Sequence, residues 1–152
     1  MENRVKRIGV LTSGGDAPGM NAAVRAVVRT AVGKGIECIG IRRGWTGLIS
    51  SDFVRLDGPS VSHIINRGGT ILYTARSEEF MDRAGREKAI ATCRLLGLDA
   101  IVAIGGDGTF RGALALSRQV AEEGQQLDVV GIPATIDNDI GCSNYTIGCK
   151  IC

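Results

Sequence analysis

Residues 99–110 constrain the fold of this chain more than any other stretch, because an apolar run there breaks into glycines around one carboxylate. The run is short and carries the β-branched residues Ile101, Val102 and Ile104, which is typical of a strand buried on both faces of a parallel sheet. Glycines then surround Asp107, and an apolar pattern with helical spacing follows. A strand, a glycine turn and a helix N-terminus in this order predict a place where a phosphate group binds.

Asp107 separates two interpretations of that turn. An aspartate beside a phosphate is unfavourable because both are anions, unless a bound Mg²⁺ lies between them. The alternative is a tight turn in which the aspartate only caps the helix. Gly105, Gly106 and Gly108 leave room for a ligand against the backbone, so their number favours the ligand site.

A second unit of the same kind opens the chain. Residues 7–12 predict a strand, residues 13–19 form a glycine-rich loop, and a helix is expected from about Met20. The loop has neither the dinucleotide-binding spacing nor a Walker A lysine, so its glycines alone are a weak signal. The other expected elements are strands over residues 37–41 and 128–132, a short helix over 60–65 and a helix over 86–96.

This alternation of strands and helices predicts an α/β fold, a doubly wound, mostly parallel sheet with helices on both faces. The 152 residues suit one ordinary domain.

A formal net charge of +2, with three Phe and one Trp, disfavours a nucleic-acid surface. No apolar run approaches a membrane span or a signal peptide, and five irregularly spaced cysteines fit reduced thiols. We therefore expect a cytoplasmic protein with no nucleic-acid or membrane partner.

A second chemical stretch, Pro-Ala-Thr-Ile-Asp-Asn-Asp, follows the last expected strand. In an extended segment alternate side chains point the same way, so Thr135, Asp137 and Asp139 are expected to share one side. Ile136 and Asn138 are expected to face the other way. A carboxylate there can accept the proton of a substrate hydroxyl during phosphoryl transfer. The alternative is an ordinary Asp/Asn-rich turn, but ligands gather at the carboxyl ends of parallel strands, which favours the functional interpretation.

The arginines and the tryptophan leave alternatives open. Arg25 and Arg29 stand four apart on the expected first helix, so they either bind an anion together or are simply solvated. Arg76 follows a second Gly-Gly turn and either reaches a phosphate or lies on the surface. Trp45 is more typical of a core position than of a ligand platform.

Five ordered motifs resemble those of the 6-phosphofructokinase family, and together they are very specific. The resemblance runs from about Arg7 to Gly148 and matches the N-terminal portion of a bacterial-type enzyme. The motifs are Gly-Gly-Asp-Ala-Pro-Gly-Met-Asn-Ala-Ala at residues 14–23, Asn-Arg-Gly-Gly-Thr at 66–70, Thr-Ala-Arg at 74–76, Gly-Gly-Asp-Gly-Thr at 105–109 and Thr-Ile-Asp-Asn-Asp at 135–139.

The resemblance implies a fold and a reaction. Residues 1–152 would be the nucleotide-binding portion of a phosphofructokinase fold, with the second, sugar-phosphate-binding half absent from this sequence. The implied activity is that of a glycolytic kinase, which uses Mg²⁺ and transfers the γ-phosphoryl group of ATP to the 1-hydroxyl of fructose 6-phosphate. Full-length family members are homo-oligomers, so a homotetramer is expected.

The resemblance also implies roles for single residues. Arg25 and Arg29 match two arginines of the family's nucleotide effector site, and Trp45 occupies the aromatic position near adenine. The implied general base is Asp137, and the implied magnesium ligand is Asp107. The implied nucleotide contacts are Gly15, Arg76, Ser77, Gly106, Asp107, Gly108 and Thr109; the candidate catalytic residues are Asp137, Thr135 and Arg76; and the candidate substrate contacts are Thr135, Ile136, Asp137 and Asp139.

Departures from the family pattern keep other functions open. A further effector-site arginine is expected near position 58, where this chain has Gly58, which argues against control by ADP. Pyrophosphate-dependent members commonly carry an Asp after the magnesium aspartate and a Lys before the threonine of the last motif. Gly108 and Ala134 stand there instead, which favours ATP. The alternatives are a non-catalytic nucleotide-binding fragment, a pyrophosphate-dependent enzyme and another Gly-Gly-Asp-Gly-Thr kinase.

Overall fold

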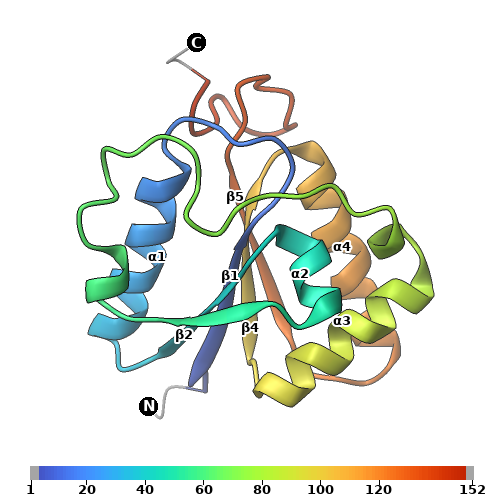
Figure 1. The fold of residues 1–152 in the computed structure, drawn as a ribbon. Helices are drawn as coiled ribbons and strands as arrows, with labels where there is room; N and C mark the ends of the chain where they lie inside the picture. Colours follow the sequence, from blue (N-terminus) through green and yellow to red (C-terminus); the bar gives the residue numbers. More distant parts are fainter. Residues whose placement is uncertain (1–3, 150–152) are drawn as a thin grey trace.

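A computed structural model describes residues 4–149 and places one five-stranded sheet among them, with β1 at its centre (Figure 1). The strand order is β3-β2-β1-β4-β5, in which β1 pairs in parallel with β2 and β4, β4 pairs in parallel with β5, and β3 is antiparallel at one edge. The elements are β1 (Arg7–Thr12), α1 (Met20–Gly33), β2 (Glu37–Ile41), α2 (Gly44–Ser50), β3 (Phe53–Leu56), the 3₁₀ turns η1 (Pro59–Val61) and η2 (Glu79–Met81), α3 (Arg83–Leu96), β4 (Ala100–Gly105), α4 (Asp107–Glu122) and β5 (Asp128–Pro133).

Helices cover both faces of the sheet, because its central strands are apolar on both sides. Helix α1 lies on one face, while α2, α3 and α4 lie on the other (Figure 1). Val10 of β1 packs with Val24 and Val28 of α1, whereas the neighbouring Leu11 packs on the other face with Trp45 and Leu116. The predicted doubly wound, mostly parallel α/β sheet is confirmed.

Most strand predictions were accurate. The bounds of β1 and β2 are those expected, and β5 is one residue longer than predicted. Helix α3 begins at Arg83, three residues before the predicted start. The predicted helix over residues 60–65 is wrong, because only the short turn η1 forms there. Helix α2 and strand β3 were not predicted: α2 is flanked by Arg43 and Ser51, whose positive φ values of 58° and 59° have no clear sequence signal.

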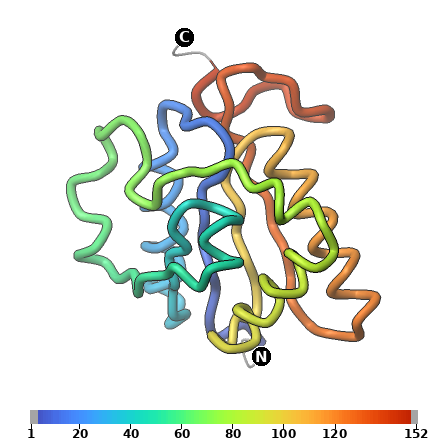
Figure 2. The backbone as a smooth tube through the Cα atoms, turned by 45° about the vertical axis from the view of Figure 1, so that its right-hand side comes forward, coloured from blue at the N-terminus to red at the C-terminus, as the bar shows by residue number. Residues whose placement is uncertain are grey.

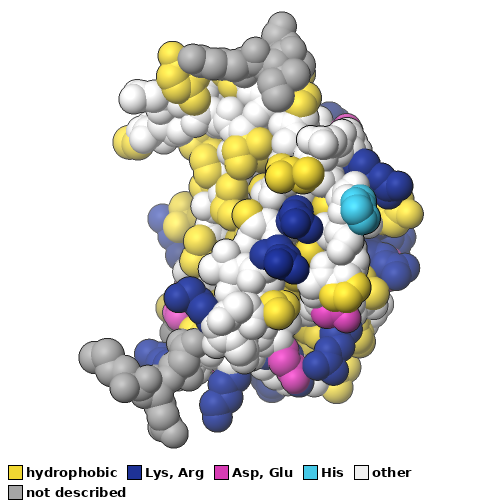
Figure 3. Space-filling view, turned by 90° about the vertical axis from the view of Figure 1, so that its left-hand side faces the viewer, with side chains coloured by type: hydrophobic (Ala, Val, Ile, Leu, Met, Phe, Trp, Pro, Cys, Tyr) yellow, Lys and Arg dark blue, Asp and Glu magenta, His cyan; other side chains and the backbone are white. Residues whose placement is uncertain are grey.

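The long connection between β3 and α3 crosses the carboxyl ends of the central strands, as the green segment of Figures 1 and 2 shows. It turns away from α1 and reaches the helices of the opposite face, so it joins both layers of the molecule. Figure 3 shows the α1 side, where basic side chains gather around the single histidine. No helix within residues 4–149 has the length and apolar character needed to span a membrane.

Candidate active site

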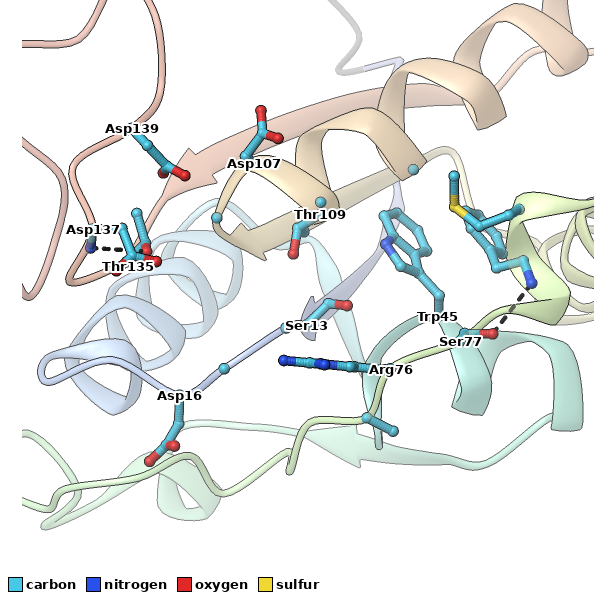
Figure 4. Close-up of a pocket in the computed structure, with 18 of the residues that line it drawn as sticks. Ser13, Asp16, Trp45, Arg76, Ser77, Asp107, Thr109, Thr135, Asp137 and Asp139 are labelled. Carbon is cyan, nitrogen blue, oxygen red and sulfur yellow. Dashed lines mark hydrogen bonds between the residues drawn. The ribbon is translucent and has the colours of Figure 1, made fainter.

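A cavity of about 570 Å³ lies at the carboxyl ends of β1, β4 and β5 (Figure 4). Parallel strands of an open sheet end at one edge, which is why chemistry from distant parts of the sequence meets there. Every residue predicted at the nucleotide or substrate site lines this cavity. Its lining is Ser13, Gly14, Gly15, Asp16, Trp45, Ala75, Arg76, Ser77, Phe80, Met81, Gly106, Asp107, Gly108, Thr109, Gly112, Thr135, Ile136, Asp137 and Asp139.

Two glycine turns form a cradle suited to phosphate groups. A Cβ atom at Gly15 or Gly108 would meet no atom within 4 Å, so the cavity reaches their backbone. Gly14 has a φ of 79°, which favours glycine at that turn. Thr109 stands in the first turn of α4, and its buried Oγ1 has no hydrogen-bond partner among the described residues. Free helix N–H groups and an unpartnered hydroxyl are donors for an anion, so the cradle fits the phosphates of a nucleotide.

Asp107 is the first residue of α4, and it does not cap the helix. The cap position is Gly106, with no side-chain capping bond. The Asp107 carboxylate pairs instead with Arg111, at 2.9 Å between Oδ2 and Nε. The alternative of a simple capping aspartate is therefore not what the structure shows.

A magnesium site would depend on Asp107 and on phosphate oxygens. Within residues 4–149, no group of three or more His, Cys, Asp or Glu side chains is placed to hold a metal ion. Mg²⁺ is commonly held by one or two carboxylates together with substrate phosphates. Asp107 shares the cavity with Asp137 and Asp139, so the donor set fits Mg²⁺ that arrives with a nucleotide.

The loop after β5 is not the extended segment that was expected. Asn138 has a φ of 49°, which breaks the alternation of side chains, and its Nδ2 donates to the carbonyl of Asn144. The prediction that Ile136 faces away is wrong, because the backbone bends at residues 136 and 137 and Ile136 lines the cavity together with Asp137 and Asp139. The N–H of Asp137 donates to Oγ1 of Thr135 at 3.2 Å, which shapes the turn.

A short C-terminal segment fixes this loop, and sequence reasoning missed it. The hydroxyl of Thr146 donates to the carbonyl of Thr135 at 2.6 Å. The N–H of Thr135 donates to Ile147, and the N–H of Ile147 donates to Pro133, each at 3.0 Å. Ile147 also packs against Gly19, where a Cβ atom would lie 2.8 Å from its Cγ2. The segment thus links the loop after β5 to the loop before α1.

Trp45 is both a core residue and part of the cavity wall. Its ring is 4% exposed and stacks on Phe80, with centroids 4.4 Å apart and an interplanar angle of 8°. Gly112 makes room for the pair, since a Cβ atom there would lie 2.7 Å from Trp45 Nε1. That Nε1 has no hydrogen-bond partner among the described residues. Phe80 was not predicted at the site, because nothing in its sequence neighbourhood distinguishes it from a core residue.

Arg25 and Arg29 lie outside the cavity, on α1. Nη1 of Arg25 donates to the carbonyl of Val61 at 2.8 Å. Arg29 is exposed, and its Nη1 lies 3.2 Å from where a Cβ atom of Gly58 would be. The structure therefore brings Arg29 beside position 58, which has no side chain to join it, and places Arg25 against the nearby carbonyl of Val61.

Comparison with known proteins identifies the family and agrees with this fold. The family model for phosphofructokinase matches residues 7–152, and the chain belongs to that family. It is 60% identical over 144 residues to ATP-dependent 6-phosphofructokinase 1 of Thermus thermophilus, covering 95% of this chain and 43% of the relative. It is 54% identical to the ATP-dependent 6-phosphofructokinase of Halothermothrix orenii, covering 95% of this chain and 42% of the relative. The chain thus spans less than half the length of these curated relatives.

Solved structures give the same fold. Pichia pastoris phosphofructokinase in the T-state matches 97% of this chain and 17% of its own, with a TM-score of 0.89 and 38% identity. The pyrophosphate-dependent phosphofructokinase from Marinobacter aquaeolei matches 95% of this chain and 37% of its own, with a TM-score of 0.85. Its identity is 21%, so that likeness concerns the fold alone.

Proposed function

We propose that this chain is the N-terminal, nucleotide-binding portion of an ATP-dependent 6-phosphofructokinase. The observation that carries the proposal is a single cavity in which a phosphate cradle faces the carboxylates of the loop after β5. The 60% and 54% identity to ATP-dependent enzymes supports it. The remaining sugar-phosphate ligands would come from the second half that longer relatives carry. We extend the proposal to a cytoplasmic, homotetrameric full-length enzyme.

The proposed reaction transfers the γ-phosphoryl group of ATP to the 1-hydroxyl of fructose 6-phosphate. A bond forms between the sugar O1 and the γ-phosphorus, the bond from that phosphorus to the β,γ-bridging oxygen breaks, and ADP leaves. The proton of the hydroxyl passes to the carboxylate of Asp137, which acts as general base. Thr135 shapes the turn that presents Asp137, and Ile136 and Asp139 complete the sugar side of the cavity.

The nucleotide side would work by positioning and charge. The Arg76 guanidinium extends into the cavity toward the glycine turn after β1 (Figure 4), where it can offset the charge of the transferred group. Gly15, Gly106, Gly108 and Thr109 would hold the phosphates, with Ser77 beside Arg76. Asp107 would hold Mg²⁺, which neutralises the charge of the β- and γ-phosphates when bound.

The choice of ATP over pyrophosphate rests on positions 108 and 134. No atom lies within 4 Å of a Cβ built at Gly108, so the space beside it is open for the rest of a nucleotide. A carboxylate at that position would repel an α-phosphate. Ala134 is fully buried and offers no charge to the end of a pyrophosphate.

Calorimetry with Mg·ATP and Mg·pyrophosphate tests the proposal, and the fluorescence of the single tryptophan, Trp45, gives an independent signal. We expect Mg·ATP to bind more tightly, and Gly108→Asp to weaken Mg·ATP more than Mg·pyrophosphate. Gly141→Asp is a matched control, because Gly141 is also open to solvent and lies outside the cavity lining. Tighter pyrophosphate binding would support the pyrophosphate-dependent alternative, and binding of neither would refute the nucleotide site.

A further inference from the structure

We propose that Thr12 and Asn21 are positioning residues that fasten residues 66–73 beneath the cavity and so fix the direction of the Arg76 side chain. The inference rests on the proposed function, because it concerns Arg76 as a ligand of ATP phosphates. Neither Thr12 nor Asn21 lines the cavity. Their effect must therefore pass through the segment that they hold.

Asn21 uses its whole amide to hold this segment. It is 2% exposed in the first turn of α1. Nδ2 donates to the carbonyls of Arg67 and Gly68 at 3.1 and 3.2 Å, and Oδ1 accepts the N–H of Ile71 at 2.7 Å. Only an amide supplies two donors and an acceptor in this geometry, so the bridge requires asparagine.

Thr12 holds the next part of the segment from the end of β1. A carbonyl only accepts, so the hydroxyl of Thr12 donates to the carbonyl of Tyr73 at 2.9 Å. Its hydrogen is then used, and Thr70 must donate to Thr12 across the 2.9 Å between the two Oγ1 atoms. Oγ1 of Thr70 in turn accepts the N–H of Leu72 at 3.2 Å. This chain of hydrogen bonds is partly buried and satisfies each hydroxyl, so it favours one conformation of the segment.

The direction of Arg76 depends on this anchoring. No hydrogen bond or ion pair joins its guanidinium to another described residue, although its backbone carbonyl accepts a bond from Thr46 at 3.5 Å. On its C-terminal side, Ser77 Oγ accepts the N–H of Phe80 at 3.3 Å. The backbone on both sides therefore sets where the side chain points. Loosening residues 66–73 would let the guanidinium spread over more positions and would weaken its contact with a phosphate.

A double-mutant cycle on the 152-residue chain tests the inference, with Mg·ATP affinity measured by calorimetry. Thr12→Val keeps the shape and removes the hydroxyl. We expect it to weaken Mg·ATP about three- to tenfold, the range that corresponds to one lost hydrogen bond. In a chain that already carries Arg76→Ala, the same change should alter affinity by less than about twofold. A purely structural role would not show this dependence on Arg76.

Thr92→Val is the matched control. Thr92 is a 4% exposed threonine of α3 whose hydroxyl bonds Ser51 and the carbonyl of Lys88, away from the cavity. It should lower the free energy of unfolding without changing affinity. If Thr12→Val does not fold, Thr70→Val breaks the same chain of bonds from its other end.

Three outcomes would overturn the inference, and they are distinguishable. Additive effects of Thr12→Val and Arg76→Ala, or an equal loss of affinity in Thr92→Val, overturn it while the nucleotide site stands. An unchanged affinity in Arg76→Ala overturns the proposed role of Arg76, and this inference with it.

Discussion

Asp107 and Arg111 lie one helical turn apart on α4 and form an ion pair with 2.9 Å between Oδ2 and Nε. Their side chains are 45% and 74% exposed, so the pair is an ordinary surface interaction of about 0.2–1 kcal/mol. If Asp107 binds Mg²⁺, Arg111 competes for the same carboxylate. We expect Arg111→Gln to lower the Mg²⁺ concentration needed for half-maximal ATP binding by up to about fivefold, measured by titration at fixed ATP. Arg118→Gln, an exposed arginine of the same helix, is the control; equal effects of the two variants would contradict the assignment.

Changing Asp137 or Asp107 to asparagine should affect different steps: the first should lower turnover, and the second should weaken the binding of Mg·ATP. In an enzyme completed with the second half of a curated relative, Asp137→Asn should lower turnover by about 10²- to 10⁴-fold, because it removes the general base. ATP binding should be nearly unchanged. Asp107→Asn should instead weaken Mg·ATP, because a carboxylate ligand is lost. Steady-state kinetics and calorimetry separate the two effects. Unaltered kinetics in both variants would mean that these loops are only turns.

Thr146→Val should loosen the loop that carries Asp137. The hydroxyl of Thr146 donates a hydrogen bond to the carbonyl of Thr135. The substitution removes this donor and leaves the carbonyl of Thr135 without it. We expect a loss of about 1 kcal/mol in the free energy of unfolding by urea. Amide hydrogen exchange should accelerate at Thr135 and Ile147, whose N–H groups bridge the two segments. Ser143→Ala removes an exposed hydroxyl bond in the same region and should not accelerate exchange at these amides.

The carboxyl group of Asp99 should make the free energy of unfolding depend on pH in the acidic range. Backbone N–H groups of Lys6 and Arg7 donate to its carboxylate and lower its pKa in the folded chain. A carboxyl whose pKa is lowered by folding contributes stability above its unfolded pKa, and that contribution is lost as pH falls through the folded pKa. Asp99→Asn should therefore flatten the decline in unfolding free energy below about pH 4. Parallel pH curves for the two proteins, measured by urea unfolding, would contradict this.

The 152-residue chain by itself should show no phosphofructokinase turnover. Arg76 is the single cationic side chain among the described residues that line the cavity, whereas a sugar phosphate needs several donors. Phosphoryl transfer depends almost wholly on positioning and charge stabilisation. A coupled assay with saturating Mg·ATP and fructose 6-phosphate measures this. Turnover near the 1–100 s⁻¹ that is typical of kinases would show that the sugar site is misplaced.

Much of the candidate site could be predicted because its glycines and carboxylates lie close to the ends of strands that are recognisable from their apolar sequences. The runs that became β1, β4 and β5 are buried in a parallel sheet, and their carboxyl ends had to meet at one edge. Gly15, Asp107 and Asp137 stand within four residues of those ends, so the cavity that joins them follows from the order of the elements.

The parts that escaped prediction depend on contacts between distant residues or on unusual backbone conformations. Asn21 is an ordinary helix residue in the sequence, and its role appears only when residues 66–71 lie beside α1. Thr146 donates a hydrogen bond to the carbonyl of Thr135, and no local sequence pattern predicts this contact. The bends at residues 136 and 137 removed the alternation of side chains that was expected over residues 135–139, because that alternation holds only for extended backbone.

The position of β1 at the centre of a parallel sheet has a consequence for the order in which the chain can fold during synthesis. β1 and β2 are both available once Ile41 has emerged, but the partner on the other side of β1 begins only at Ala100. At about 5–20 residues per second, a ribosome needs on the order of 3–12 s to add the intervening stretch. For those seconds the central strand β1 of the nascent chain keeps one edge open to a chaperone or to a neighbouring chain.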